Sequence, residues 1–130
     1  MTIKNFIINA CIAGLVVACY AFKFHKEQRF ESKEETQIFV VTAYCPCEKC
    51  CGRWADGYFA NGEKVGGLAI AAPKEIHFGT LIDVPGYGVA KVKDRGGSIK
   101  GNKIDVYFDE HEVAKKWGVQ ELKCKIIKGE

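Results

Sequence analysis

The chain has 130 residues, of which 48% are hydrophobic and 27% are charged. This length and balance fit one globular domain, and they exclude collagen-like chains, wholly disordered chains and pairs of large domains. The formal net charge is +3, but residues 27–130 hold 16 Lys and Arg against 16 Asp and Glu, so the sequence does not support a nucleic-acid-binding surface.

The N-terminal segment is strongly apolar. Residues 6–22 contain no charged side chain, whereas Lys4 precedes them and Lys23 follows them. Seventeen uncharged residues lie at the lower limit of a membrane span, and they also fit the apolar region of a signal peptide. The small residue before Cys19 additionally resembles the lipobox of bacterial lipoproteins. A retained anchor, lipidation at Cys19 and simple cleavage stay open. Each predicts an exported or membrane-anchored protein of the cell envelope, in the periplasm, at the outer membrane or on the cell surface.

A charged segment follows the apolar one. Residues 23–35 carry eight charged side chains among thirteen, so they bury little surface and are expected to form a solvated linker. The sequence therefore predicts three parts. These are a signal or membrane-anchor segment in residues 1–22, with the membrane as its partner, a linker in residues 23–35 and a folded domain in residues 36–128.

The folded part is expected to be mainly β. Short runs rich in β-branched and aromatic residues, bounded by glycine and proline, predict strands over residues 37–43, 67–72, 80–84, 89–93, 103–108 and 121–127. One helix is predicted after Asp109, which can cap it, and Gly118 ends it. Six short strands, one short helix and many glycines favour a small closed six-stranded β-barrel.

Two carboxylates differ from the solvated charges around them. Asp94 follows a predicted strand and precedes two glycines, which leave room for a ligand near the backbone. Asp105 lies inside an apolar strand, where alternation places Ile104 and Val106 on one face and Asp105 on the other. From this pattern alone, either residue is also compatible with an ordinary turn or surface carboxylate.

A cysteine-rich loop follows the first predicted strand. Its candidate disulfide or metal-binding residues are Cys45, Cys47, Cys50 and Cys51. Disulfides are one interpretation, with Cys124 of the last strand closing back on the loop, as is common in exported domains. Another is a site for zinc or a similar soft metal, to which His77 or His111 would contribute from outside, although His111 is expected to be exposed in the first helical turn. Free thiols are the third. No other cofactor is expected, and the loop is interpreted as structural.

The stretch from Gly79 to Phe108 reads G-T-x-x-x-V-P-G-Y-G and then K-D-R-G-G-x-I-K-G-N-K-I-D-V-Y-F. It resembles the three-aspartate (3D) domain of bacterial cell-wall proteins, which is related to the membrane-bound lytic transglycosylase A family. The resemblance implies a double-psi β-barrel, glycan strands of peptidoglycan as the partner, and functional carboxylates at Asp94 and Asp105. The sequence departs from the family pattern at Ala72, where the first of the family's three aspartates normally stands.

The function that this resemblance implies is peptidoglycan cleavage by an exported or membrane-tethered lytic transglycosylase-like enzyme. Asp105 is then the acid/base and Asp94 the carboxylate that tunes it, and the two roles could be exchanged. Candidate glycan contacts are Tyr44, Lys100 and Asn102. Two alternatives stay open, namely a non-catalytic peptidoglycan-binding barrel that has lost its first aspartate, and a structural module stabilised by thiols or metal.

Overall fold

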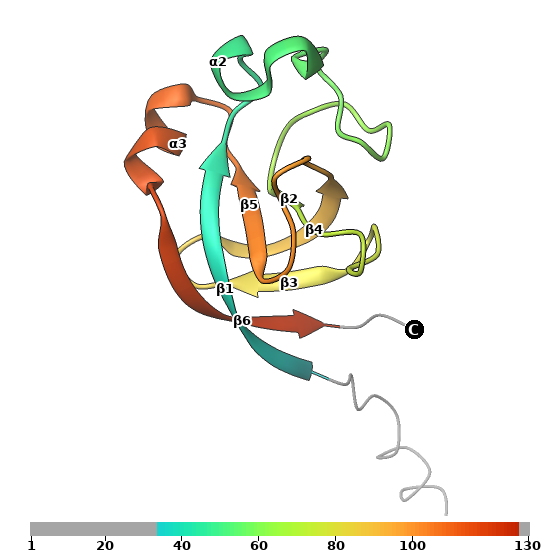
Figure 1. Ribbon diagram of the computed structural model, residues 1–130, viewed down its shortest axis with the longest axis vertical. Helices are drawn as coiled ribbons and strands as arrows, with labels where there is room; N and C mark the ends of the chain where they lie inside the picture. The colour runs from blue at the N-terminus through green and yellow to red at the C-terminus, as the bar shows by residue number, and fades with distance from the viewer. Residues whose placement is uncertain (1–33, 128–130) are drawn as a thin grey trace, which may run out of the picture. The chain divides into compact units, whose positions relative to one another are not determined.

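The computed structural model describes residues 34–127, which form a mainly β domain built on a closed six-stranded barrel (Figure 1). The strands are β1 (Glu34–Tyr44), β2 (Ala69–Ala71), β3 (Leu81–Val84), β4 (Gly88–Asp94), β5 (Lys103–Tyr107) and β6 (Gln120–Ile127). The helices are α2 (Glu48–Cys51), α3 (His111–Trp117) and the 3-10 turn η1 (Gly52–Trp54). The predicted anchor in residues 1–22 and most of the predicted linker lie outside the described residues. Within residues 34–127, no helix is both long and apolar enough to span a bilayer.

Neighbouring strands follow the order β1-β5-β2-β4-β3-β6, and β6 closes the barrel by pairing with β1. The pairs β1–β5 and β2–β4 are parallel, and the other pairs are antiparallel. Strand β1 is long enough to serve two neighbours: Glu34–Val41 pairs with β6, and Val40–Tyr44 pairs with β5. Closure satisfies the backbone groups that an open sheet would leave at its edges.

The barrel interior is filled by alternate side chains from all six strands. The buried cluster comprises Phe39, Val41, Ile70, Ala72, Ile82, Val84, Ala90, Val92, Ile104, Val106, Cys124 and Ile126. Ile104 and Val106 are fully buried whereas Asp105 between them is only partly buried, which confirms the predicted faces of β5. The barrel is therefore a packed core, and the polar side chains of its strands must face outward or toward one end.

The helices differ from the sequence prediction in two ways. Helix α2 was not predicted, because its four residues are too few to show a periodic pattern. Helix α3 begins at His111 with Glu110 as its N-cap and no side-chain cap hydrogen bond, so the prediction that Asp109 caps it is wrong. The Asp109 carboxylate instead accepts a hydrogen bond of 3.0 Å from the Tyr107 hydroxyl.

Candidate functional site

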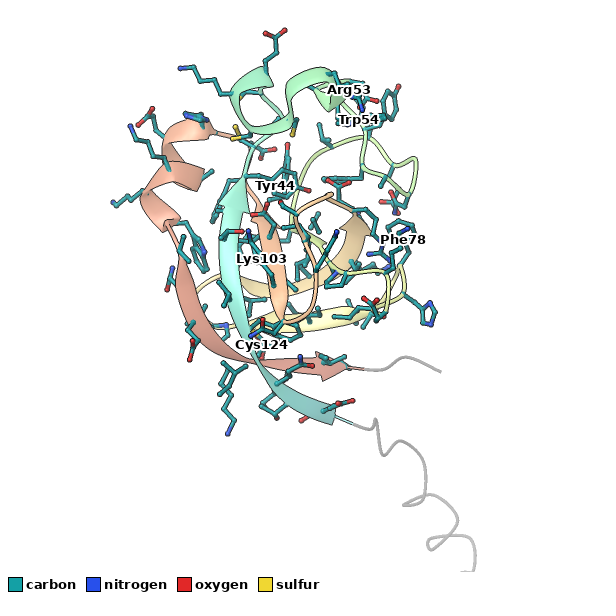
Figure 2. The ribbon with its side chains drawn as sticks, viewed as in Figure 1. Tyr44, Arg53, Trp54, Phe78, Lys103 and Cys124 are labelled. Atoms are coloured by element: carbon teal, nitrogen blue, oxygen red, sulfur yellow. The ribbon has the colours of Figure 1, made fainter. Side chains whose placement is uncertain are left out.

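A cleft of about 960 Å³ opens at one end of the barrel. Its floor is formed by strand residues, including Tyr44 of β1, Ala71 of β2, Asp94 of β4 and Asp105 of β5. Its wall is formed by the segment after α2, which includes Trp54 and residues 55–60. Figure 2 shows Tyr44 near the middle of this end and Trp54 on the segment beside it.

The two predicted carboxylates meet at one register position of the sheet. Ala71 of β2 pairs with Asp94 of β4 on one side and with Asp105 of β5 on the other. Asp105 is in turn opposite Thr42 of β1. Four neighbouring strands therefore carry Thr42, Asp105, Ala71 and Asp94 in one row, and the small methyl group of Ala71 leaves the space between the carboxylates open.

A β-bulge brings Asp94 into this row. Ile70 pairs with Val92, but the next residue, Ala71, pairs with Asp94, so Lys93 is the extra residue on β4. Without the shift, Lys93 would be opposite Ala71, and Asp94 would belong to the other face of the strand. The bulge thus places a carboxylate where regular pairing would place an ammonium group.

The Asp94 carboxylate is held by three donors. The Tyr44 hydroxyl donates to Oδ2 at 2.6 Å, and the backbone N–H groups of Ala60 and Arg95 donate to Oδ1 at 2.9 and 2.8 Å. Burial and the hydrogen bond to Asp94 both raise the pKa of Tyr44, so its hydroxyl stays a donor. Asp94 is therefore a fixed hydrogen-bond acceptor that joins β1, the cleft wall and β4.

Asp105 lies in a different environment. The pKa of Asp105 is raised from 3.8 to about 6, and burial is the largest cause. The hydrogen bond from Thr42 and the Lys103 ammonium lower this pKa, whereas the nearby charge of Asp94 raises it. The Thr42 hydroxyl donates to Oδ1 of Asp105 at 3.0 Å. A carboxyl group with this pKa is partly protonated near neutral pH, as a general acid must be. The row therefore contains one carboxyl that can give a proton and one that is held as an acceptor.

Arg95 links the site to Ala72, the position at which the sequence lacks the first aspartate of the pattern it resembles. Its guanidinium donates to the carbonyl oxygens of Ala72 at 3.1 Å and Ile76 at 2.7 Å, and it stacks on the Phe78 ring at 4.0 Å. The Ala72 side chain is fully buried in the core cluster. Position 72 therefore contributes no polar group to the cleft, and the strand carboxylates that line it are Asp94 of β4 and Asp105 of β5.

The structure does not bring all the predicted glycan contacts together. Tyr44 lines the cleft, but Lys100 and Asn102 are exposed on the loop between β4 and β5 and do not line it. The backbone carbonyl of Asn102 accepts a hydrogen bond from the Val40 N–H at 2.9 Å, so this residue helps to position β1.

Three loop cysteines converge on a histidine outside the loop. The sulfur atoms of Cys45, Cys47 and Cys50 lie 3.5, 3.4 and 3.5 Å from Nδ1 of His111, the first residue of α3. The expectation that His111 is merely exposed is wrong, since the side chain is partly buried against these thiols. Cys51 faces elsewhere and donates to the Cys45 carbonyl oxygen at 3.2 Å.

The five cysteines of the described residues are free. Cys124, predicted to close a disulfide with the loop, lies in the core cluster with Sγ 3.7 Å from the Leu122 carbonyl oxygen. Figure 2 shows Cys124 at the end of the barrel opposite the cysteine loop. The sequence could not reveal this separation, because it follows from the strand order of the closed barrel and not from any local pattern.

Two residues of the site were not identified from the sequence, namely Thr42 and Arg95. Thr42 and Arg95 lie within or next to the motifs that carry the family resemblance, and this position in the sequence could have identified them as site residues. His111 was named from the sequence only as one of two possible outside ligands, beside His77, since it lies 66 positions after Cys45.

The fold and the site together define the class of this domain. It is a closed six-stranded barrel with two carboxylates in one open cleft. Residues 68–128 match the family model of the 3D domain, which confirms the resemblance seen in the motif from Gly79 to Phe108.

Two relatives come from Bacillus subtilis (strain 168). YabE, whose name describes a cell wall shaping protein, is 37% identical over 98 residues, which are 75% of this chain and 24% of that protein. The cell wall-binding protein YocH is 44% identical over 98 residues, which are 75% of this chain and 34% of that protein. The chain thus spans about a quarter to a third of the length of these relatives.

Proposed function

We propose that this domain binds glycan strands of peptidoglycan in the cleft and cleaves the bond between N-acetylmuramic acid and N-acetylglucosamine. The 3D domain match and the cell-wall names of the two relatives support a role in the cell envelope. The pairing of Asp94 and Asp105 on either side of Ala71 is the observation that carries the proposal. Export, with or without a retained anchor in residues 1–22, would bring the domain to this substrate.

Asp105 acts as the general acid. Its pKa of about 6 leaves a protonated fraction that can donate to the leaving glycosidic oxygen as the bond breaks. The resulting carboxylate then takes the proton from the 6-hydroxyl of the same muramic acid, whose oxygen bonds to the anomeric carbon. The product is a 1,6-anhydro sugar, no water is consumed, and Asp105 recovers its proton.

Asp94 supports the positive charge that develops on the sugar. Its three hydrogen-bond donors fix the carboxylate, so little reorganisation is needed when charge appears in the cleft. Its negative charge also disfavours ionisation of Asp105, which lies on the other side of Ala71 in the row.

Digestion of purified sacculi by the full-length chain tests this proposal. We expect soluble anhydro-muropeptides from the wild type and a loss of at least about 100-fold for Asp105→Asn, since general acid catalysis contributes about 10²–10⁴-fold. Asp94→Asn should also lower the rate. Asp83→Asn is the matched control, because Asp83 lies on barrel strand β3 and does not line the cleft. Unchanged release by both cleft variants would overturn the assignment.

A second function is favoured by position 72. The buried Ala72 methyl group removes the carboxylate that the family pattern places there, and this favours a barrel that holds glycan without cutting it. Co-sedimentation with sacculi distinguishes the two functions. Binding without any released muropeptide supports the binding module, and hydrated products in place of anhydro products would indicate hydrolysis.

A further inference from the structure

We propose that Cys45, Cys47, Cys50 and His111 form a structural Zn²⁺ site that fastens the cleft wall to the barrel. This proposal does not depend on the reaction assigned to Asp94 and Asp105. Each of the four residues offers one donor atom, and all four donor atoms lie within 4.8 Å of one another.

The donor spacing fits a tetrahedral metal ion. With Zn–S bonds of about 2.3 Å and Zn–N bonds of about 2.0–2.1 Å, tetrahedral sulfur atoms lie about 3.8 Å apart, and sulfur and nitrogen lie about 3.6 Å apart. The three sulfur-to-nitrogen distances to His111 are 3.4–3.5 Å, and Cys45 Sγ lies 3.6 Å from Cys50 Sγ. The sulfur atoms of Cys45 and Cys47, which lie 3.0 Å apart, must move slightly apart to admit the ion.

The fold brings these donors together from two distant segments. Strands β1 and β5 are parallel and end side by side, with Tyr44 opposite Tyr107 and the Phe108 N–H bonded to the Tyr44 carbonyl oxygen at 2.9 Å. The cysteine loop leaves the end of β1, and the segment that begins α3 leaves the end of β5 (Figure 1). Cys45 and His111 therefore meet because their strands are neighbours.

The loop itself is shaped around the thiols. The N–H groups of Cys50 and Cys51 donate to the Cys47 carbonyl oxygen at 3.1 and 2.9 Å, which turns Cys50 back toward Cys47. The turn leaves Cys51 on the other side, bonded to the Cys45 carbonyl oxygen. Cys50 is exposed, so an ion can enter from solvent.

Three thiols and one imidazole form a closed coordination set with no position left for substrate or water, which is typical of structural zinc. On binding, each thiol releases its proton to solvent and the imidazole coordinates through Nδ1. The ion would then tie together β1, α2 and α3. Because η1 and the cleft wall continue directly from α2, it would also fix Trp54 beside the carboxylates.

Metal titration of the full-length chain, purified in detergent and reduced, tests the site. We expect one equivalent of Co²⁺ to give the thiolate charge-transfer and visible absorption of a tetrahedral complex, and one equivalent of Zn²⁺ to displace it. Cys47→Ser and His111→Ala should weaken binding by more than roughly 100-fold, since loss of outer-shell partners alone costs about 10–100-fold. Elemental analysis of the unreduced protein should show zinc.

Cys51→Ser and Cys124→Ser are matched controls, because these thiols lie outside the donor set, and both should bind like the wild type. Circular dichroism of the metal-free variants checks that they remain folded, so a failure to fold is not read as a lost ligand. The proposal is overturned if the folded chain binds no stoichiometric metal, or if Cys51→Ser loses as much affinity as Cys47→Ser. It is also overturned if intact mass shows a disulfide within residues 45–51 that persists in the metal-loaded protein.

Discussion

The Tyr44 hydroxyl donates a 2.6 Å hydrogen bond to the Asp94 carboxylate, and so joins the last residue of β1 to the last residue of β4. Tyr44 is also the residue before Cys45, where the cysteine loop begins. Its ring packs edge-to-face on Tyr107 with centroids 5.5 Å apart. One side chain thus connects the carboxylate row with the end of the barrel that carries the proposed zinc site.

Replacing Tyr44 by Phe keeps this ring packing and removes only the donor. The remaining donors to Asp94 are two backbone N–H groups, so the carboxylate loses its contact with β1. We expect urea denaturation to show a loss of about 1.5–3 kcal/mol in the free energy of unfolding, the usual range for a hydrogen bond to a charged group. Tyr58→Phe is the control, since Tyr58 is 57% exposed and also lines the cleft. Equal losses in both variants would contradict the role of the hydroxyl.

The raised pKa of Asp105 predicts a pH dependence of stability. Its pKa is 3.8 in the unfolded reference and about 6 in the fold, so the folded state binds more protons between these values. The free energy of unfolding should therefore fall as the pH rises from about 4 to about 6, by up to roughly 3 kcal/mol. Asp105→Asn should remove this slope and be more stable than the wild type at pH 7.5. A slope that survives in Asp105→Asn but disappears in Asp83→Asn would refute the assignment.

The same group predicts the pH profile of the proposed cleavage. A general acid must start protonated, so muropeptide release should fall about tenfold per pH unit well above pH 6. Replacing Thr42 by Val removes a hydrogen bond that lowers the pKa of Asp105. The fall in muropeptide release should therefore begin at a higher pH in Thr42→Val. If this pH is the same in Thr42→Val and the wild type, another group controls the rate.

The sequence predicted the strands well, because alternation of apolar residues reports directly on the faces of a barrel strand. It could not predict that Asp94 and Asp105 share a row. That arrangement depends on the strand order and on the bulge at Lys93, and neither leaves a local pattern. For the same reason the sequence could not choose between His77 and His111 as a partner of the thiols, since the parallel pairing of β1 with β5 is what brings His111 to them.

Arg95 should stabilise the segment after β2. Its guanidinium reaches the carbonyl oxygens of Ala72 and Ile76 together, a geometry that the single ammonium group of lysine does not reproduce. We expect Arg95→Lys to lower the free energy of unfolding by about 1–3 kcal/mol and to speed amide hydrogen exchange in residues 73–79. Arg53→Lys is the matched control, since Arg53 stacks on Trp54, which is 68% exposed. Exchange that is unchanged by Arg95→Lys would argue against this role.

Restoring the family's first aspartate should not restore a cleft carboxylate in this chain. The Ala72 side chain is fully enclosed among apolar neighbours, so Ala72→Asp would bury a carboxylate there. We expect a loss of about 3 kcal/mol or more in the free energy of unfolding, because a buried charge without a matched partner is strongly destabilising. Val89→Asp, which adds a carboxylate at a position that is 49% exposed, should cost about 1 kcal/mol or less. A stable Ala72→Asp variant with faster muropeptide release would show instead that the chain directly after β2 can turn this side chain into the cleft, which Arg95 also lines.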